Sequence, residues 1–211
     1  MVSLNPRYLF QTRYDLSPAD LKVYKKYSNS PIQKITICRT PLDKKLGIAL
    51  NVITLGQWQR AVANSGYDSL MHLFMVITLT NGVKILFEKN ESVRLRLLNP
   101  KGDITSKTET MDVRGYGANS LTLQQLYENG LASMGNDVFY TYKFDSLNCQ
   151  HFINSILGAN NLLTEELNTF IMQDLQSIVN ETPSYLRPLG NGITTFARKA
   201  REFFGMGLNL H

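Results

Sequence analysis

The stretch that decides the fold is HLFMVITLTNGVKILFEKNESVR, residues 72–94. Two runs of apolar and β-branched residues lie on either side of Asn81 and Gly82. An Asn-Gly pair between such runs is a strong signal for a β-hairpin. The pattern predicts one strand over residues 72–80 and a second over residues 83–94. We therefore interpret the rest of the chain as elements that pack around this hairpin.

The loop length of the hairpin decides which acidic residue lies near His72. A three-residue loop with Gly82 in the left-handed conformation places Glu88 on the same face as His72, one pair further along and within diagonal reach. A two-residue turn would instead place Glu91 opposite His72 and send Glu88 to the other face. From the residues alone the carboxylate partner of His72 is therefore Glu88 or Glu91, with Asn90 as a third choice.

The rest of the chain alternates between helical and strand patterns. Thr122 with Gln125 has the spacing of a capping box at a helix start, and Gly135 marks the end of that helix. Similar signals predict further helices at residues 54–64, 148–157, 164–180 and 194–204, strands at 33–38 and 138–144, and a loop or edge strand at 100–110. This order predicts the α+β class, a small antiparallel sheet with packed helices.

Composition favours one folded domain with a basic extension. Hydrophobic residues make up 43% of the 211 residues, which is enough for a sizeable core. Residues 1–45 hold nine Lys or Arg and three Asp, a balance of +6, although the whole chain carries only +5. We expect a basic N-terminal arm (1–30), a main folded domain (31–182) and a C-terminal amphipathic helical segment (183–211). The arm would favour an anionic surface: a membrane, nucleic acid or a capsid.

The sequence contains no apolar run of the roughly 18–20 residues that a membrane span needs. Its first residues also lack the apolar run of a signal peptide. We therefore expect a soluble intracellular protein whose two cysteines stay reduced. Cys38, His72, Cys149 and His151 lack paired-ligand spacing, so we expect no metal and no cofactor.

Cys149 is the candidate nucleophile. It begins a predicted helix, and Phe152, Ile153 and Ile156 follow it at the spacing of one helix face, so the thiol should lie against the sheet. Unpaired N–H groups in the first turn of a helix favour an anion. His72 is the candidate base. His151 should point away from the thiol, because residues two apart on a helix are not neighbours.

The run Leu147-Asn148-Cys149-Gln150-His151-Phe152-Ile153 resembles the Asn-Cys-Glu-His-Phe signature of lecithin–retinol acyltransferase-like proteins. These are circularly permuted, NlpC-type papain-like thiol hydrolases in which the His strand precedes the Cys helix. Residues 72–74 and 87–90, with Gln173-Asp174, are similar to a viral subgroup of that family. The resemblance implies a papain-like fold and a triad of Cys149, His72 and Glu88. Two features depart from the pattern: His151 replaces the subgroup's Asp, and the second His of the acyltransferase branch is absent.

The resemblance implies a cysteine-dependent hydrolase or acyltransferase that cleaves an amide (peptide or isopeptide) or a lipid ester bond through an acyl-enzyme. For a viral protein, it implies the host cytoplasm or the virion as the location. The alternative is a catalytically silent structural or virion-associated protein that uses the same fold as a docking module. We expect residues 190–211 to serve docking rather than catalysis.

Overall fold

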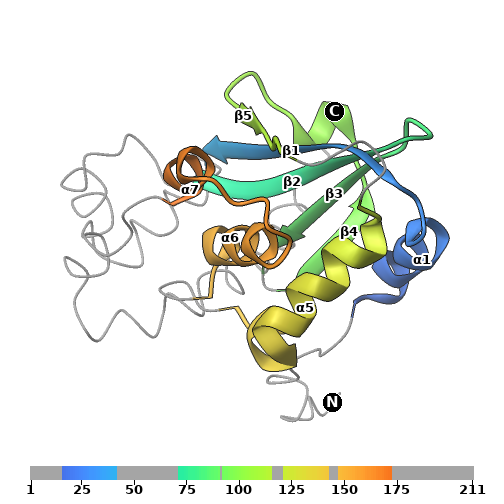
Figure 1. The fold of residues 1–211 in the computed structure, drawn as a ribbon. Helices are drawn as coiled ribbons and strands as arrows, with labels where there is room; N and C mark the ends of the chain where they lie inside the picture. The colour runs from blue at the N-terminus through green and yellow to red at the C-terminus, as the bar shows by residue number, and fades with distance from the viewer. Residues whose placement is uncertain (1–15, 42–70, 91, 116–120, 143–146, 173–211) are drawn as a thin grey trace, which may run out of the picture.

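A computed structural model of the protein describes residues 16–41, 71–90, 92–115, 121–142 and 147–172. They form a five-stranded antiparallel sheet with packed helices, which confirms the predicted α+β class (Figure 1). The strands are β1 (Ile32–Pro41), β2 (Met71–Leu79), β3 (Lys84–Lys89), β4 (Val93–Leu97) and β5 (Glu109–Asp112), in the spatial order β4-β3-β2-β1-β5. The helices are α1 (Pro18–Tyr27), α4 (Pro100–Asp103), α5 (Leu123–Tyr140), α6 (Cys149–Ala159) and α7 (Glu165–Ile171).

Several predictions lie outside the described residues. These are the first half of the basic arm (1–15), the helix at 54–64, Glu91, Gln173-Asp174 and the C-terminal segment (183–211). The other half of the arm includes α1. Asp20 in this helix is 1% exposed, and its carboxylate accepts a hydrogen bond of 3.3 Å from the N–H of Leu95 in β4. Part of the segment predicted as an arm is therefore a helix that packs on the sheet.

The hairpin of β2 and β3 has the three-residue loop, one of the two loop lengths that the sequence left open. Gly82 has a φ of 80°, and the N–H of Leu79 donates to the carbonyl of Val83 over 2.8 Å. Phe74 pairs with Glu88 across the two strands. A φ in this region is strained for residues with a side chain, which is why glycine occupies the position. The register excludes the two-residue turn.

The prediction of one strand over 83–94 is wrong. The chain turns after Lys89, where the N–H of Asn90 donates to the carbonyl of Ser92 over 3.1 Å, and β4 then pairs with β3. Buried and exposed residues alternate on both sides of this turn. Val93 and Leu95 in β4 are buried, as are Lys89 and Phe87, the β3 residues with which they pair. Hydrophobic alternation alone does not distinguish one long strand from two short ones joined by a tight turn.

Helix α5 begins with the predicted capping box at Thr122 and Gln125. Gly135, with φ 74° and ψ 158°, interrupts the helix as predicted, but helical structure resumes and continues to Tyr140. The strand predicted at 138–144 is therefore wrong at residues 138–140. Consecutive Phe139 and Tyr140 are both buried, an arrangement that a half-buried strand does not give.

Helices α6 and α7 differ from the prediction only at their ends. Gly158 does not stop α6, which runs to Ala159, and the left-handed residue that follows is Asn161 with φ 56°. Thr164 caps α7 as predicted, and this helix ends at Ile171, because Met172 is extended; residues 173–180 of the prediction lie outside the described residues.

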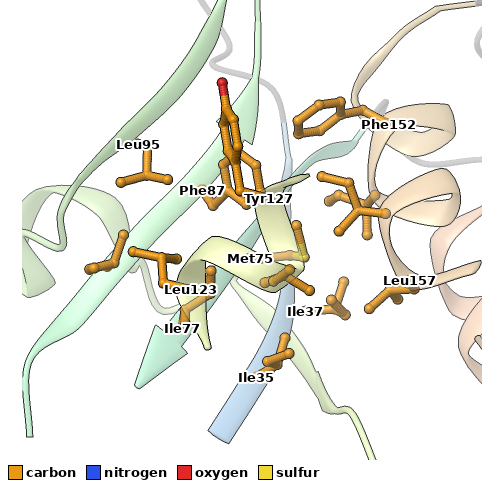
Figure 2. Packing of buried hydrophobic residues seen from close by; sticks show 14 of the residues in the cluster. Ile35, Ile37, Met75, Ile77, Phe87, Leu95, Leu123, Tyr127, Phe152 and Leu157 are labelled. Atoms are coloured by element: carbon orange, nitrogen blue, oxygen red, sulfur yellow. The ribbon is translucent and has the colours of Figure 1, made fainter. Parts of the chain in front are cut away.

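The main core lies between the sheet and helices α5 and α6, which lie against one face (Figure 1). Figure 2 shows this contact, in which side chains from β1, β2 and β3 meet those of the two helices: Ile35, Ile37, Met75, Ile77, Phe87, Leu123, Tyr127, Phe152 and Leu157. The helices approach closely at Gly130, where an added Cβ would lie 2.9 Å from Ile156. This packing holds the start of α6 next to the β2–β3 hairpin.

Candidate thiol active site

His72 and Glu88 form a hydrogen-bonded pair across the hairpin. The Nε2 atom of His72 lies 2.8 Å from Oε2 of Glu88. The register explains the contact, since Glu88 pairs with Phe74 and thus shares the face of His72 one pair further along. The structure therefore selects Glu88 among the acidic residues that the sequence left open.

The environment keeps Glu88 ionised. Its side chain is only 8% exposed, and burial acts to raise the pKa of this carboxyl. The hydrogen bond and charge of His72, together with the charges of Arg96 and Arg94, outweigh burial and lower the pKa. A buried carboxylate that stays charged is a suitable partner for an imidazolium.

His72 lies between Glu88 and Cys149. Burial acts to lower the pKa of His72, but hydrogen bonds to Cys149 and Glu88 and the charges of both groups outweigh burial and raise the pKa to about 10. Because Nε2 of His72 is hydrogen-bonded to Glu88, Nδ1 is the ring nitrogen that can interact with the sulfur of Cys149. The imidazole is thus held between a carboxylate and a thiol, the order that a cysteine nucleophile and its base require.

Cys149 is the first residue of α6 and is 8% exposed. The preceding Asn148 caps the helix, and its side-chain oxygen accepts hydrogen bonds from the N–H groups of Gln150 and His151. Among the described residues, no acceptor lies within hydrogen-bond distance of the N–H of Cys149 itself. An N–H group at a helix start is suited to donate to a negatively charged oxygen formed next to the sulfur.

Cys38, the other cysteine, occupies a different environment. It lies in β1, is 1% exposed and packs against Phe74, Val76 and Leu86. Burial, with a smaller contribution from the charge of Asp112, raises the pKa of Cys38 to about 12. A thiol in this state is a small hydrophobic side chain rather than a nucleophile.

We expect iodoacetamide at about pH 7 to alkylate Cys149 at least about 100-fold faster than Cys38, because only the thiolate reacts. Mass spectrometry of the two cysteine peptides over time measures both rates in one sample. Cys38→Ala is the matched control and should leave the fast phase intact, whereas Cys149→Ala should remove it. Faster alkylation of Cys38 than of Cys149 would contradict this assignment.

Two residues close in sequence to the site carry contacts that the sequence patterns did not reveal. Lys89 follows Glu88 in β3 but points to the opposite face, where its Nζ donates to the carbonyl of Val138 over 2.7 Å and lies 5.5 Å from the ring centre of Phe152. Lys89 is 1% exposed, and burial lowers its pKa to about 8. Strand parity could have identified it, since Lys89 shares the inward face of Phe87. The other residue is His151, whose ring Nδ1 lies 3.0 Å from Oδ1 of Asn148.

A surface hollow of about 560 Å³ lies elsewhere, between β1, β5 and α7. It is lined by Arg39, Met111, Glu165, Glu166, Thr169 and Phe170, and none of the three site residues contributes to it. The described residues include no group of three or more His, Cys, Asp or Glu placed to hold a metal ion. They also include no helix with the length and apolar character needed to cross a membrane.

A scan of protein-family models finds no match to this chain, and searches of curated proteins and of solved structures find no significant match.

Proposed function

We propose that the protein is a cysteine-dependent hydrolase or acyltransferase that forms an acyl-enzyme with an amide or ester substrate. The observation that carries the proposal is the 2.8 Å contact between His72 and Glu88 beside Cys149, which is the first residue of its helix and interacts with the His72 ring. The resemblance of residues 147–153 to the permuted papain-like signature supports the same assignment. Order along the chain does not matter for such a triad, which is recognised by geometry.

In the first half-reaction, the thiolate of Cys149 attacks the acyl carbon, and a carbon–sulfur bond forms. The resulting oxyanion accepts a hydrogen bond from the N–H of Cys149. His72 then gives its Nδ1 proton to the leaving amine or alkoxide as the carbon–nitrogen or carbon–oxygen bond breaks. Throughout the reaction, Glu88 accepts a hydrogen bond from Nε2–H of His72. This bond fixes the orientation of the ring and stabilises its charged form.

In the second half-reaction, His72 takes a proton from water as the water oxygen attacks the thioester carbon. The carbon–sulfur bond breaks, the acid is released, and the pair of thiolate and imidazolium is restored. An alcohol or amine in place of water would give acyl transfer. Hydrolase and acyltransferase activity thus require the same three side chains and differ only in the acceptor.

Covalent labelling tests the proposal directly. We expect a peptidyl electrophile or a long-chain acyl electrophile to label the native protein and Cys38→Ala faster than it labels glutathione, and not to label Cys149→Ala. The probe that reacts faster identifies the substrate as peptide-like or lipid-like. If Cys149 reacts with both probes no faster than glutathione does, the catalytically silent docking module becomes the better explanation, in line with the low exposure of this thiol.

A further inference from the structure

The side chain of Asn148 holds an unusual set of hydrogen bonds. Its Oδ1 accepts from the N–H of Gln150 over 3.0 Å, from the N–H of His151 over 3.2 Å, and faces Nδ1 of the His151 ring at 3.0 Å. The first two contacts are what an N-cap Asn ordinarily makes. The third adds a side-chain donor to the same oxygen.

This third contact requires a proton on Nδ1 of His151, because the amide oxygen is an acceptor only. Both the cationic ring and the neutral tautomer protonated at Nδ1 meet that requirement. Three donors directed at one atom also fix the orientation of the amide. Exchanging Oδ1 and Nδ2 of Asn148, which is 2% exposed, would place an NH2 group against all three donors.

The position of His151 in the helix explains how the contact arises. Asn148 is the N-cap, Cys149 is the first helical residue and His151 the third. In a capping box the third residue accepts a hydrogen bond from the backbone of the N-cap. Here the third residue faces the N-cap side chain instead. The cap and its partner thus lie on either side of the cysteine in sequence, and both determine the geometry of the first turn.

From this arrangement we propose that His151 is a positioning residue for Cys149, acting by locking the Asn148 cap. The locked cap occupies the N–H groups of Gln150 and His151 and leaves that of Cys149 for the oxyanion. It also keeps the sulfur at the start of an ordered helix next to His72. The inference rests on the proposed function, since it assigns His151 to the reactivity of that thiol.

Three substitutions at one position separate a lock from a general structural role. His151→Asn keeps an N–H donor on a nitrogen bonded directly to Cγ, the position that Nδ1 has in histidine. His151→Gln moves the amide one bond further out, and His151→Phe keeps a ring without any donor. We expect the rate of Cys149 alkylation by iodoacetamide to stay within about 3-fold of native in His151→Asn. In the Gln and Phe variants we expect it to fall about 10-fold, the equivalent of losing one hydrogen bond.

Hydrogen exchange of the Gln150 amide is measured on the same samples, and thermal unfolding of each variant checks that it folds. Faster Gln150 exchange in the Gln and Phe variants but not in the Asn variant would support the lock. Equal alkylation rates in all three variants would overturn it, as would a loss in His151→Asn as large as in His151→Phe. If native protein turns over no substrate, the proposed function fails, yet the ranking of alkylation rates still decides the role of His151.

Discussion

Replacement of His72 by Ala is expected to lower kcat/KM for an activated ester or thioester by about 10⁴-fold or more. The substitution removes both the group that takes the thiol proton and the group that returns it to the leaving atom. Glu88→Gln should lower the rate by a smaller factor, because an amide oxygen still accepts the Nε2 proton while the stabilising charge is lost. Steady-state kinetics of purified variants measures both effects, with Cys149→Ala as the reference for zero turnover.

The triad also predicts how the substitutions combine. His72→Ala added to Cys149→Ala should cost nothing further, since residues that act as a unit are strongly non-additive. Thermal unfolding of each variant separates loss of chemistry from loss of fold. Full activity in Glu88→Gln would show that the 2.8 Å contact with His72 has no catalytic role.

The difference in unfolding free energy between native protein and Lys89→Met is expected to change by about 2–3 kcal/mol between about pH 7 and about pH 10. Burial lowers the pKa of Lys89 from 10.5 to about 8, so between these values the unfolded chain binds a proton that the folded chain does not. The contribution of Lys89 to the free energy of unfolding therefore rises with pH across this window, and each pH unit is worth about 1.4 kcal/mol. The variant lacks this contribution.

Denaturant unfolding of native protein and Lys89→Met at several pH values gives the comparison. The difference between their unfolding free energies isolates Lys89, because His72 titrates in both proteins. The pKa of His72 is raised, so the stabilisation it provides is present below its ordinary value and is lost as pH rises toward about 10. Lys84→Met, which removes an exposed lysine from the same strand, is the matched control for loss of charge. A difference that stays flat with pH would contradict the burial of the ammonium group.

Local patterns predicted the parts of the site that depend on local geometry. The Asn81-Gly82 pair predicted the hairpin and limited the partner of His72 to a few residues, and the register in the structure then selected Glu88. Helix-start signals placed Cys149 in the first turn of its helix. The hairpin and the helix start depend on neighbours within a few residues, so the sequence predicts them, whereas the loop length that sets the register stayed open.

Features that depend on tertiary contacts were not predictable in the same way. Burial of Lys89 requires the carbonyl of Val138, 49 residues away, and this contact exists only once α5 packs on the sheet. Phe139 likewise lies in a helix that places its ring against that of Phe152, at a centroid distance of 5.2 Å, a contact between segments far apart in the sequence. The bond between His151 and Asn148 is local, but a helix pattern gives side-chain faces and not ring orientations.

Glu88 and Lys89 are consecutive residues that point to opposite faces of β3, one toward His72 and the other into the helix-covered core. A slip of one residue in this strand would exchange them, placing a carboxylate beneath Phe152 and an ammonium beside the imidazole. Both groups would then be in unfavourable surroundings, and the His72 ring would lose its anionic partner. Misaligned chains would therefore be both unstable and without the proposed activity, so that any turnover by a preparation would measure how faithfully its strands have paired.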